Sequence, residues 1–408
     1  MKDNRQLKGI IEKHDNWRNS CINLVPSENI MSRDVAKALS SDMGHRYFFS
    51  KTFETETGIS YEYRGTKHIQ ELYEVTTQIA KDLFKADYVN LSLLSGHIAN
   101  LNILFSYCKP GDTIICSDTN MGGYPGLASD KLPSYLGINV EFLPQETIGG
   151  QVDIEALEKL ILKTRPKIVM LSSSITIFPF PVEEVSALCK LYNIPFCYDA
   201  SHPLGLIAGG AFQQPFDEGA DLIIGSTHKS FPGPQGGIIL GRGDQYQAIE
   251  NATDFIVVDN IHLNRIAALA ISMLEMKRFG QDYAKQIIAN SKALAKALYS
   301  EGFDIAHRER GYTESHQFLM NSNSDYSTFT KNLEETNIIL DNSGRVGLNE
   351  VTRVGMKEND MPIIASFFRK ILEGKNDSKL KCEIREFKSQ FNKMQYCFED
   401  NESVLDEI

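Results

Sequence analysis

The sequence predicts an α/β protein in which a mostly parallel sheet is covered by helices on both faces, followed by a smaller C-terminal α/β domain. Two observations lead to this fold class. Between about residues 68 and 240, short apolar segments of strand length alternate with amphipathic segments of helix length, a pattern typical of parallel sheets. After about residue 260 the pattern changes to one long helix and then to shorter strand-and-helix segments.

The elements of the first region follow from their own patterns. In residues 69–84 apolar side chains recur at intervals of three or four, which predicts a helix with one buried stripe. Asp153 stands where an N-cap is expected for a helix over 153–164. Further helices are predicted over 97–108 and 182–193, and strands over 88–94, 113–118, 167–174, 195–201 and 221–227.

The 408 residues suffice for two domains, or for one large domain with an appendage. Residues 261–303 are predicted to form the long helix, and the middle of the charged segment after Leu372 is predicted to form an amphipathic helix. The expected division is an N-terminal arm over 1–45, a large domain over 46–275, a small C-terminal domain over 276–375 and a charged C-terminal tail over 376–408.

The composition argues against several classes of function. A net charge of −11 does not suit a general nucleic-acid binder, which needs a basic face. No apolar segment approaches the length of a signal peptide or a membrane span, so we expect a cytoplasmic protein. The seven cysteines are scattered without a CxxC pair and predict reduced thiols. No metal-ligand spacing occurs, so no metal site is predicted.

Polar residues stand at the carboxyl ends of five predicted strands. Ligands of parallel sheets gather at this edge, because the loops that follow the strands meet there. Packing alone does not explain five such residues at five strand ends. They are Ser95, Asp118, Ser174, Asp199 and Lys229.

An aspartate and a lysine at neighbouring strand ends suit pyridoxal phosphate. Lys229 would form a Schiff base with the aldehyde of the cofactor, and Asp199 would pair with the pyridine nitrogen. The two residues are 30 positions apart, about one crossover unit, which allows neighbouring strands. Taken singly, Asp199 also fits a capping carboxylate and Lys229 a solvated lysine. Their pairing in this sheet pattern favours the cofactor site.

The segment "LLSGHIANLN" offers a site for the phosphate of the cofactor. It predicts a strand followed by Ser95, Gly96 and His97 at the start of a helix. Backbone N–H groups at a helix N-terminus favour an anion, and glycine lets the backbone approach it closely. By itself, this tripeptide also fits an ordinary strand-to-helix turn.

Six segments, in order over roughly residues 20 to 370, resemble the serine hydroxymethyltransferase family. Members of that family are pyridoxal-phosphate enzymes of fold type I, with a large cofactor-binding domain and a smaller C-terminal domain. The resemblance implies a PLP-dependent transferase, a small amino acid as substrate, and a homodimer with active sites at the subunit interface. The segments are "LVPSEN", "LFKADYVNLSLLSGHIANLNILFSYCKPGDTI", "MGGYPG", "YDASHPLGLIAGG", "STHKSFPGPQGGIIL" and "TRVGM".

The resemblance also implies a role for each matched residue. Lys229 would hold the cofactor covalently, Asp199 would bind the pyridine nitrogen, and His202 would lie near the phenolic oxygen of the cofactor. Arg353 would bind the carboxylate of the amino acid, supported by Ser27, and Tyr47 matches a family tyrosine with catalytic and substrate-binding roles. The remaining cofactor-binding residues would be Ser95, Gly96, His97, Tyr124, Ser174, Thr227 and His228, with Tyr124 at the place of a stacked histidine.

The sequence departs from the family pattern around the active site. The stretch "GHRYFFSKTFETETGISYEYRG" has extra residues, so the acid–base glutamate of the family falls on Phe49 when counted from one side and on Glu54 or Glu56 from the other. The glycine-rich loop that reaches the phosphate of the neighbouring subunit is replaced by "FIVVDNIH" at 255–262, and an arginine of the lysine segment has become Gln235. The segment before Arg353 is also shorter than the folate-contacting loop of the family, so the use of tetrahydrofolate stays open.

These observations predict an enzyme of serine hydroxymethyltransferase type that makes or breaks the Cα–Cβ bond of a small β-hydroxy amino acid through a glycine-like carbanion. A threonine-type aldolase or transaldolase is the alternative that shares the same core chemistry. Decarboxylation or a biosynthetic condensation on the same fold is a further alternative, and a non-catalytic scaffold a remote one. Neither nucleic acid nor membrane is expected as a partner.

Overall fold

The computed structural model of the chain describes residues 2–51, 53–54, 56–145, 147–149, 151–243, 246–321, 326–398 and 405. It divides into two compact units. The first unit comprises Met1–Asn29 and Asp282–Tyr396, and the second comprises Ile30–Gln281 and Cys397–Ile408. The long helix α10 (Leu263–Ser300) contributes to both. Each unit is described by itself.

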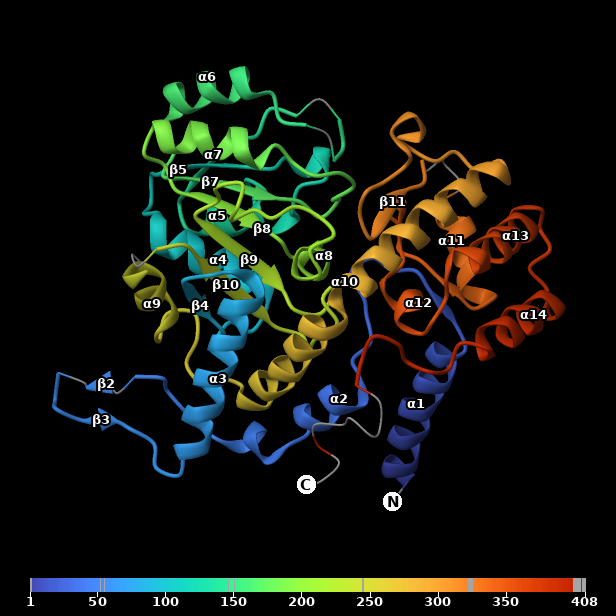
Figure 1. Cartoon of the computed structure of the whole chain (residues 1–408), viewed down its shortest axis with the longest axis horizontal. Coiled ribbons are helices and arrows are strands. Elements are labelled where there is room, and N and C mark those ends of the chain that lie inside the picture. The colour runs from blue at the N-terminus through green and yellow to red at the C-terminus, as the bar shows by residue number, and fades with distance from the viewer. Residues whose placement is uncertain are drawn as a thin grey trace. The chain divides into compact units, whose positions relative to one another are not determined.

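The second unit is built on a seven-stranded sheet in its described part, with strand order β4-β10-β9-β8-β7-β5-β6 (Figure 1). Neighbouring strands from β9 to β6 pair in parallel, whereas β10 is antiparallel to both β9 and β4. The predicted mostly parallel α/β sheet is therefore confirmed. The strands are β4 (Tyr88–Asn90), β5 (Thr113–Cys116), β6 (Asn139–Phe142), β7 (Ile168–Ser172), β8 (Phe196–Asp199), β9 (Leu222–Ser226) and β10 (Gly237–Gly241).

Helices of this unit pack against the sheet and shield its apolar strands. Helix α4 (Gly96–Tyr107) lies against β9 and β10, and α7 (Val182–Leu191) lies against β8. Side-chain caps fix two of the helix starts, since Ser95 accepts from the Ile98 amide at 3.1 Å and Asp153 accepts from the Ala156 amide at 3.0 Å. The other helices are α2 (Arg33–Leu39), α3 (Lys67–Phe84), α5 (Leu132–Tyr135), α6 (Ile154–Thr164), α8 (Leu204–Ala208) and α9 (Gln247–Thr253), and a hairpin is formed by β2 (Phe53–Glu54) and β3 (Ser60–Tyr61).

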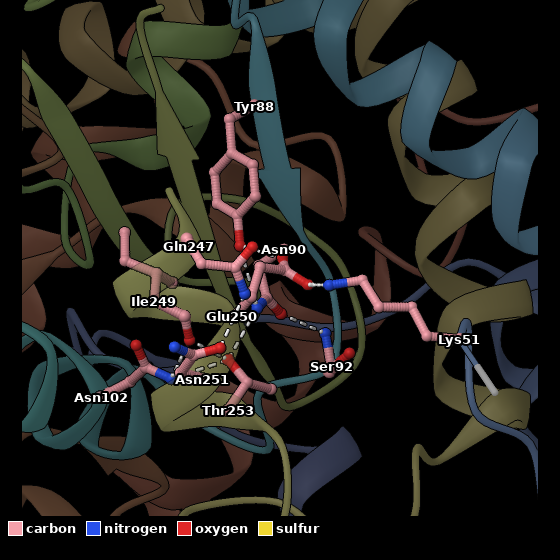
Figure 2. A network of polar contacts seen from close by, with 10 residues as sticks. All are labelled: Lys51, Tyr88, Asn90, Ser92, Asn102, Gln247, Ile249, Glu250, Asn251 and Thr253. Atoms are coloured by element: carbon pink, nitrogen blue, oxygen red, sulfur yellow. Dashed lines mark hydrogen bonds and ion pairs between the residues drawn. The ribbon is translucent and has the colours of Figure 1, made fainter. Parts of the chain in front are cut away.

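A polar network fastens α9 to the edge strand β4 (Figure 2). The Glu250 carboxylate accepts from the Tyr88 hydroxyl and from Lys51 Nζ, the latter at 2.6 Å. Thr253 Oγ1 accepts from the side-chain amides of Asn90 and Asn102, at 2.9 and 2.8 Å. Because Asn90 ends β4, this network fixes the strand end that leads into Ser95 and α4.

The first unit contains two small strand pairs. Strand β1 (Ile22–Asn23) pairs in parallel with β12 (Ile338–Ile339), and β11 (Gln317–Leu319) pairs antiparallel with β13 (Arg345–Gly347). The predicted amphipathic helix of the C-terminal segment is present as α14 (Ser378–Ser389), which buries Leu380, Ile384 and Phe387. The end of the tail, at 399–404 and 406–408, lies outside the described residues. The remaining helices are α1 (Lys2–Asn19), α11 (Tyr326–Glu335), α12 (Asn349–Arg353) and α13 (Met361–Leu372).

Neither a membrane span nor a disulfide occurs in the part of the chain that the structure describes. None of its helices combines the length and the apolar character needed to cross a membrane. All seven cysteines are described, none of them forms a disulfide, and five of them are buried. Burial raises the pKa of the Cys116 thiol to about 12, so this group stays protonated at neutral pH.

Candidate active site

The carboxyl ends of the parallel strands meet at one edge of the sheet and bring together the predicted polar residues. Asp199 ends β8, and Lys229 follows the neighbouring strand β9. Ser95 follows β4 and Ser174 follows β7. Asp118, after β5, is engaged locally, because its carboxylate accepts from the Asn120 amide at 2.9 Å and caps a short 3₁₀ turn. In the structure, Asp118 is therefore a capping residue of this turn.

Asp199 is a buried carboxylate with three hydrogen-bond donors. It is 6% exposed. One oxygen accepts from Ser172 Oγ at 2.7 Å and from Asn100 Nδ2 at 3.1 Å, and the other accepts from the Ser201 amide at 2.9 Å. These donors fix the orientation of the carboxylate. Ser172 and Asn100 were not among the residues predicted from the sequence.

The turn that carries Lys229 is tied to the loop that follows Asp199. The Ser226 amide donates to Ser201 Oγ at 3.2 Å. Ser230 Oγ donates to the His202 carbonyl and accepts from the Gly205 amide at 3.0 Å. Because these bonds join the two loops directly, the half-buried Lys229 and the buried Asp199 cannot shift independently.

Two further predicted residues shape the lysine turn. Thr227 is buried, and its hydroxyl donates to the Pro234 carbonyl at 2.6 Å, which closes the turn. His228 is half-buried, and among the described residues its buried Nδ1 has no hydrogen-bond partner. Burial, together with the nearby charge of Lys229, lowers the pKa of His228 to about 4. His228 is therefore neutral at physiological pH.

The start of α4 forms a close-packed cradle. The amides of Gly96 and His97 belong to its first turn, where N–H groups have no partner within the helix. A Cβ on Gly96 would lie 2.4 Å from Ser226 Oγ and 2.9 Å from Ser201 Oγ. A side chain here would force both serine hydroxyls to move, so the helix N-terminus, the Asp199 loop and the end of β9 converge on one point.

Tyr124 and His97 form a pair beside this cradle. One nitrogen of His97, Nδ1, lies 2.7 Å from the Tyr124 hydroxyl, and the two rings meet edge to face. Burial and the charge of Asp199 raise the pKa of Tyr124 to about 12, so the phenol is neutral at pH 7. The other predicted cofactor residues are His202, which is buried, and Ser174, which is half-buried with its amide donating to the Gly122 carbonyl at 2.8 Å.

These residues fit pyridoxal phosphate. A buried carboxylate suits a protonated ring nitrogen, a lysine follows the adjacent strand, and the N-terminus of a twelve-residue helix suits a phosphate. The absence of a Cβ at Gly96 provides the close backbone approach that such an anion requires. Among the described residues, no group of three or more histidine, cysteine or acidic side chains is arranged to hold a metal ion.

The two predicted carboxylate-binding residues lie in the first unit and are linked there by one side chain. Asn349 Nδ2 donates to the Pro26 carbonyl at 2.9 Å, next to the half-buried Ser27, and Asn349 begins the helix that ends at Arg353. Arg353 is 0% exposed. Its Nη1 donates to the Tyr396 carbonyl at 2.5 Å, and its guanidinium lies 5.6 Å from the centre of the Tyr283 ring. This contact with the C-terminal segment was not predicted from the sequence.

The tyrosine and the glutamate of the rearranged stretch are less closely placed. Tyr47 is 47% exposed, and its ring centre lies 5.5 Å from that of Tyr63. Glu56 is exposed, and the side chain of Glu54 lies outside the described residues. The position of an acid–base glutamate therefore stays an open prediction.

Comparisons with known proteins agree with this geometry. The family model for serine hydroxymethyltransferase matches residues 1–368. The serine hydroxymethyltransferase of Methanobrevibacter smithii is 41% identical over 414 residues, covering 97% of this chain and 96% of the relative. That of Pyrococcus furiosus is 37% identical over 418 residues, with coverage of 97% and 96%. A crystal structure of an L-threonine transaldolase from Pseudomonas fluorescens has a TM-score of 0.89 at 27% identity, covering 100% of this chain and 97% of that one.

The fold and the strand-end constellation define a pyridoxal-phosphate enzyme of fold type I. The match over most of its length shows, further, that the chain belongs to the serine hydroxymethyltransferase family. Its cofactor is pyridoxal phosphate, and it is a transferase.

Replacing Gly96 by alanine is expected to displace the three segments that meet there. The added Cβ cannot be accommodated at 2.4 Å from Ser226 Oγ, so the free energy of unfolding should fall by about 1–3 kcal/mol and cofactor affinity should fall with it. Urea denaturation and titration of the apoprotein with pyridoxal phosphate measure both. Gly9→Ala is the control, since nothing lies within 4 Å of a Cβ there. Wild-type cofactor affinity in Gly96→Ala would contradict the cradle.

Acid is expected to destabilise the protein through His228. Its pKa is about 4 in the folded chain against an ordinary value of 6.5, so the unfolded chain binds the proton more readily. The contribution of neutral His228 to the free energy of unfolding is fully present above pH 6.5 and is lost as the pH falls toward 4. Between pH 7 and pH 5, the free energy of unfolding should therefore fall by about 2 kcal/mol less in His228→Gln than in the wild type. His68→Gln, an exposed site, is the control, and equal acid sensitivity of wild type and His228→Gln would rule this explanation out.

Proposed function

We propose that this enzyme makes or breaks the Cα–Cβ bond of a small β-hydroxy amino acid. The observation that carries the proposal is the joint placement of Asp199 and Lys229 at adjacent strand ends, held by hydrogen bonds between their loops. The curated relatives at 36–41% identity are named serine hydroxymethyltransferase, which supports the same reaction type.

Different residues of the second unit would bind different parts of the cofactor. When bound, pyridoxal phosphate withdraws electrons from the Cα of an attached amino acid. Lys229 would supply the amine that holds the cofactor and gives it up to the substrate. Asp199 would hold a proton on the ring nitrogen, since its three donors fix its orientation. The Gly96 and His97 amides would bind the phosphate, and the Tyr124 ring would stack on the cofactor.

Residues outside the cradle would orient the substrate. Arg353, with Ser27, would bind the carboxylate, for which a planar guanidinium is suited. His228 is neutral at pH 7, so it would accept or donate a hydrogen bond near Lys229 without adding a charge that competes with the lysine. For the proton on the β-hydroxyl, Tyr47, Glu54 and Glu56 are the candidates.

A transaldolase is the second candidate function. The solved structure of an L-threonine transaldolase, with its TM-score of 0.89, supports it. So does the sequence at 255–262, at Gln235 and before Arg353, where the chain departs from the family pattern. The two functions share the bond that is cleaved and differ in the acceptor. A homodimer and a cytoplasmic location, both expected from the sequence, stay proposals.

The choice of acceptor is tested by a product assay. Purified protein is incubated with serine or threonine, with and without tetrahydrofolate, and with an aromatic aldehyde in parallel. Serine cleavage that rises with tetrahydrofolate supports the hydroxymethyltransferase. Transfer of the glycine unit to the aldehyde without folate supports the transaldolase. Release of carbon dioxide instead of an aldehyde would refute Cα–Cβ cleavage.

Replacing Lys229 by alanine is expected to abolish turnover, because no other amine replaces the one that holds the cofactor. Borohydride reduction of the wild type, followed by peptide mass spectrometry, should find the cofactor attached to Lys229. Lys163→Ala removes an exposed lysine of α6 and should behave as the wild type. Full turnover by Lys229→Ala, or cofactor on a different lysine, would show the site to be misassigned.

Replacing Arg353 by glutamine is expected to raise KM for the amino acid by about 30-fold or more, because a buried carboxylate would lose its charged partner. The affinity for pyridoxal phosphate should be unchanged, which separates this effect from general unfolding. Arg369→Gln, at an exposed ion pair on α13, is the control. An unaltered KM in Arg353→Gln would exclude the carboxylate role.

A further inference from the structure

A buried arginine outside the predicted site has no counterion among the residues that the structure describes. Arg265 lies in the first turn of α10 and is 4% exposed. Its Nη2 donates to the Leu91 carbonyl, while among the described residues Nε and Nη1 are buried without any hydrogen-bond partner. No ion pair of the described part of the chain includes it. An arginine in this state is costly, because a charge removed from water normally needs an opposite charge or full hydrogen bonding.

The groups around Arg265 do not neutralise it. Burial lowers the pKa of its guanidinium only to about 10, so it remains a cation at neutral pH. The neighbouring group that favours its charge is Tyr73, yet burial raises the pKa of that phenol, which is therefore neutral. The Glu250 carboxylate of the network in Figure 2 is already bonded to Lys51 and Tyr88. Among the described residues, Arg265 therefore has no partner carboxylate.

The guanidinium lies against the backbone that forms the cradle. A Cβ on Gly236 would lie 2.5 Å from Nη1 of Arg265. On the next residue, Gly237, a Cβ would lie 2.3 Å from the Ser95 carbonyl oxygen and 3.2 Å from the Gly96 amide nitrogen. Two adjacent glycines therefore separate Arg265 from the start of α4. On the other side, the Leu91 carbonyl that Arg265 binds belongs to the loop leading to Ser95.

We propose that Arg265 supplies positive charge to the phosphate group of pyridoxal phosphate at the N-terminus of α4, and that this phosphate is the counterion that Arg265 lacks. The inference rests on the cofactor site proposed above. In this arrangement the helix amides orient the phosphate by hydrogen bonds, and Arg265 adds attraction across the Gly236–Gly237 backbone. Its charge acts through that backbone in a buried setting, where screening by water is weak.

The test compares two ligands that differ only in the phosphate. Apoprotein is titrated with pyridoxal phosphate and with pyridoxal, followed by visible absorbance. Arg265→Gln keeps a donor for the Leu91 carbonyl and removes the charge. It is expected to weaken pyridoxal phosphate binding by about 30-fold or more and to change pyridoxal binding by less than about twofold. Arg265→Lys keeps the charge and should retain most of the preference for the phosphorylated ligand.

The control is Arg242→Gln, which removes the same charge from an exposed arginine just beyond the opposite end of β10 and should leave both affinities unchanged. An equal loss of affinity for both ligands in Arg265→Gln would overturn the proposal in favour of a structural arginine. Unchanged binding, or Arg265→Lys behaving like Arg265→Gln, would overturn it as well. If the wild type binds both ligands equally well, the proposed phosphate site at the start of α4 is itself wrong.

Discussion

The structure of the site depends on the hydrogen bonds that join the loop after β8 to the turn after β9. Ser201 and Ser230 bridge the two segments, and Gly205 allows their backbones to touch, since a Cβ there would lie 2.3 Å from the Ser230 carbonyl oxygen. A carboxylate and an amine on separate strands act on one cofactor only if their spacing is constant. Small hydroxyl side chains provide that constancy without filling the space that the ring requires.

The ionisable side chains near these two loops differ in how they are paired. The Asp199 carboxylate is held by Ser172 and Asn100, and His228 beside Lys229 is neutral at pH 7. Arg265 is the exception, because it is buried without an opposite charge among the described residues. An unpaired buried cation lowers the free energy of unfolding of the apoprotein. An anion that binds beside it would raise that free energy again.

The order of helices and strands could be predicted from the sequence because periodicity reports burial directly. The antiparallel direction of β10 could not be predicted, because an apolar segment does not show which way its strand runs in the sheet. Strand β6 was missed because only half-buried or exposed residues form it. Asp199 and Lys229 were recognisable from their place after apolar runs. Ser172 was not distinguishable from Ser173 and Ser174, and the contact of Arg353 with Tyr396 joins residues 43 positions apart, which local patterns do not encode.

Asp199 and Lys229 are proposed to hold the same ring, and a crystal structure of the cofactor-loaded protein would show whether they do. We expect continuous density from Lys229 Nζ to the cofactor, with a carboxylate oxygen of Asp199 at hydrogen-bond distance from the ring nitrogen. A cofactor bound elsewhere, or a ring whose nitrogen faces away from Asp199, would contradict it.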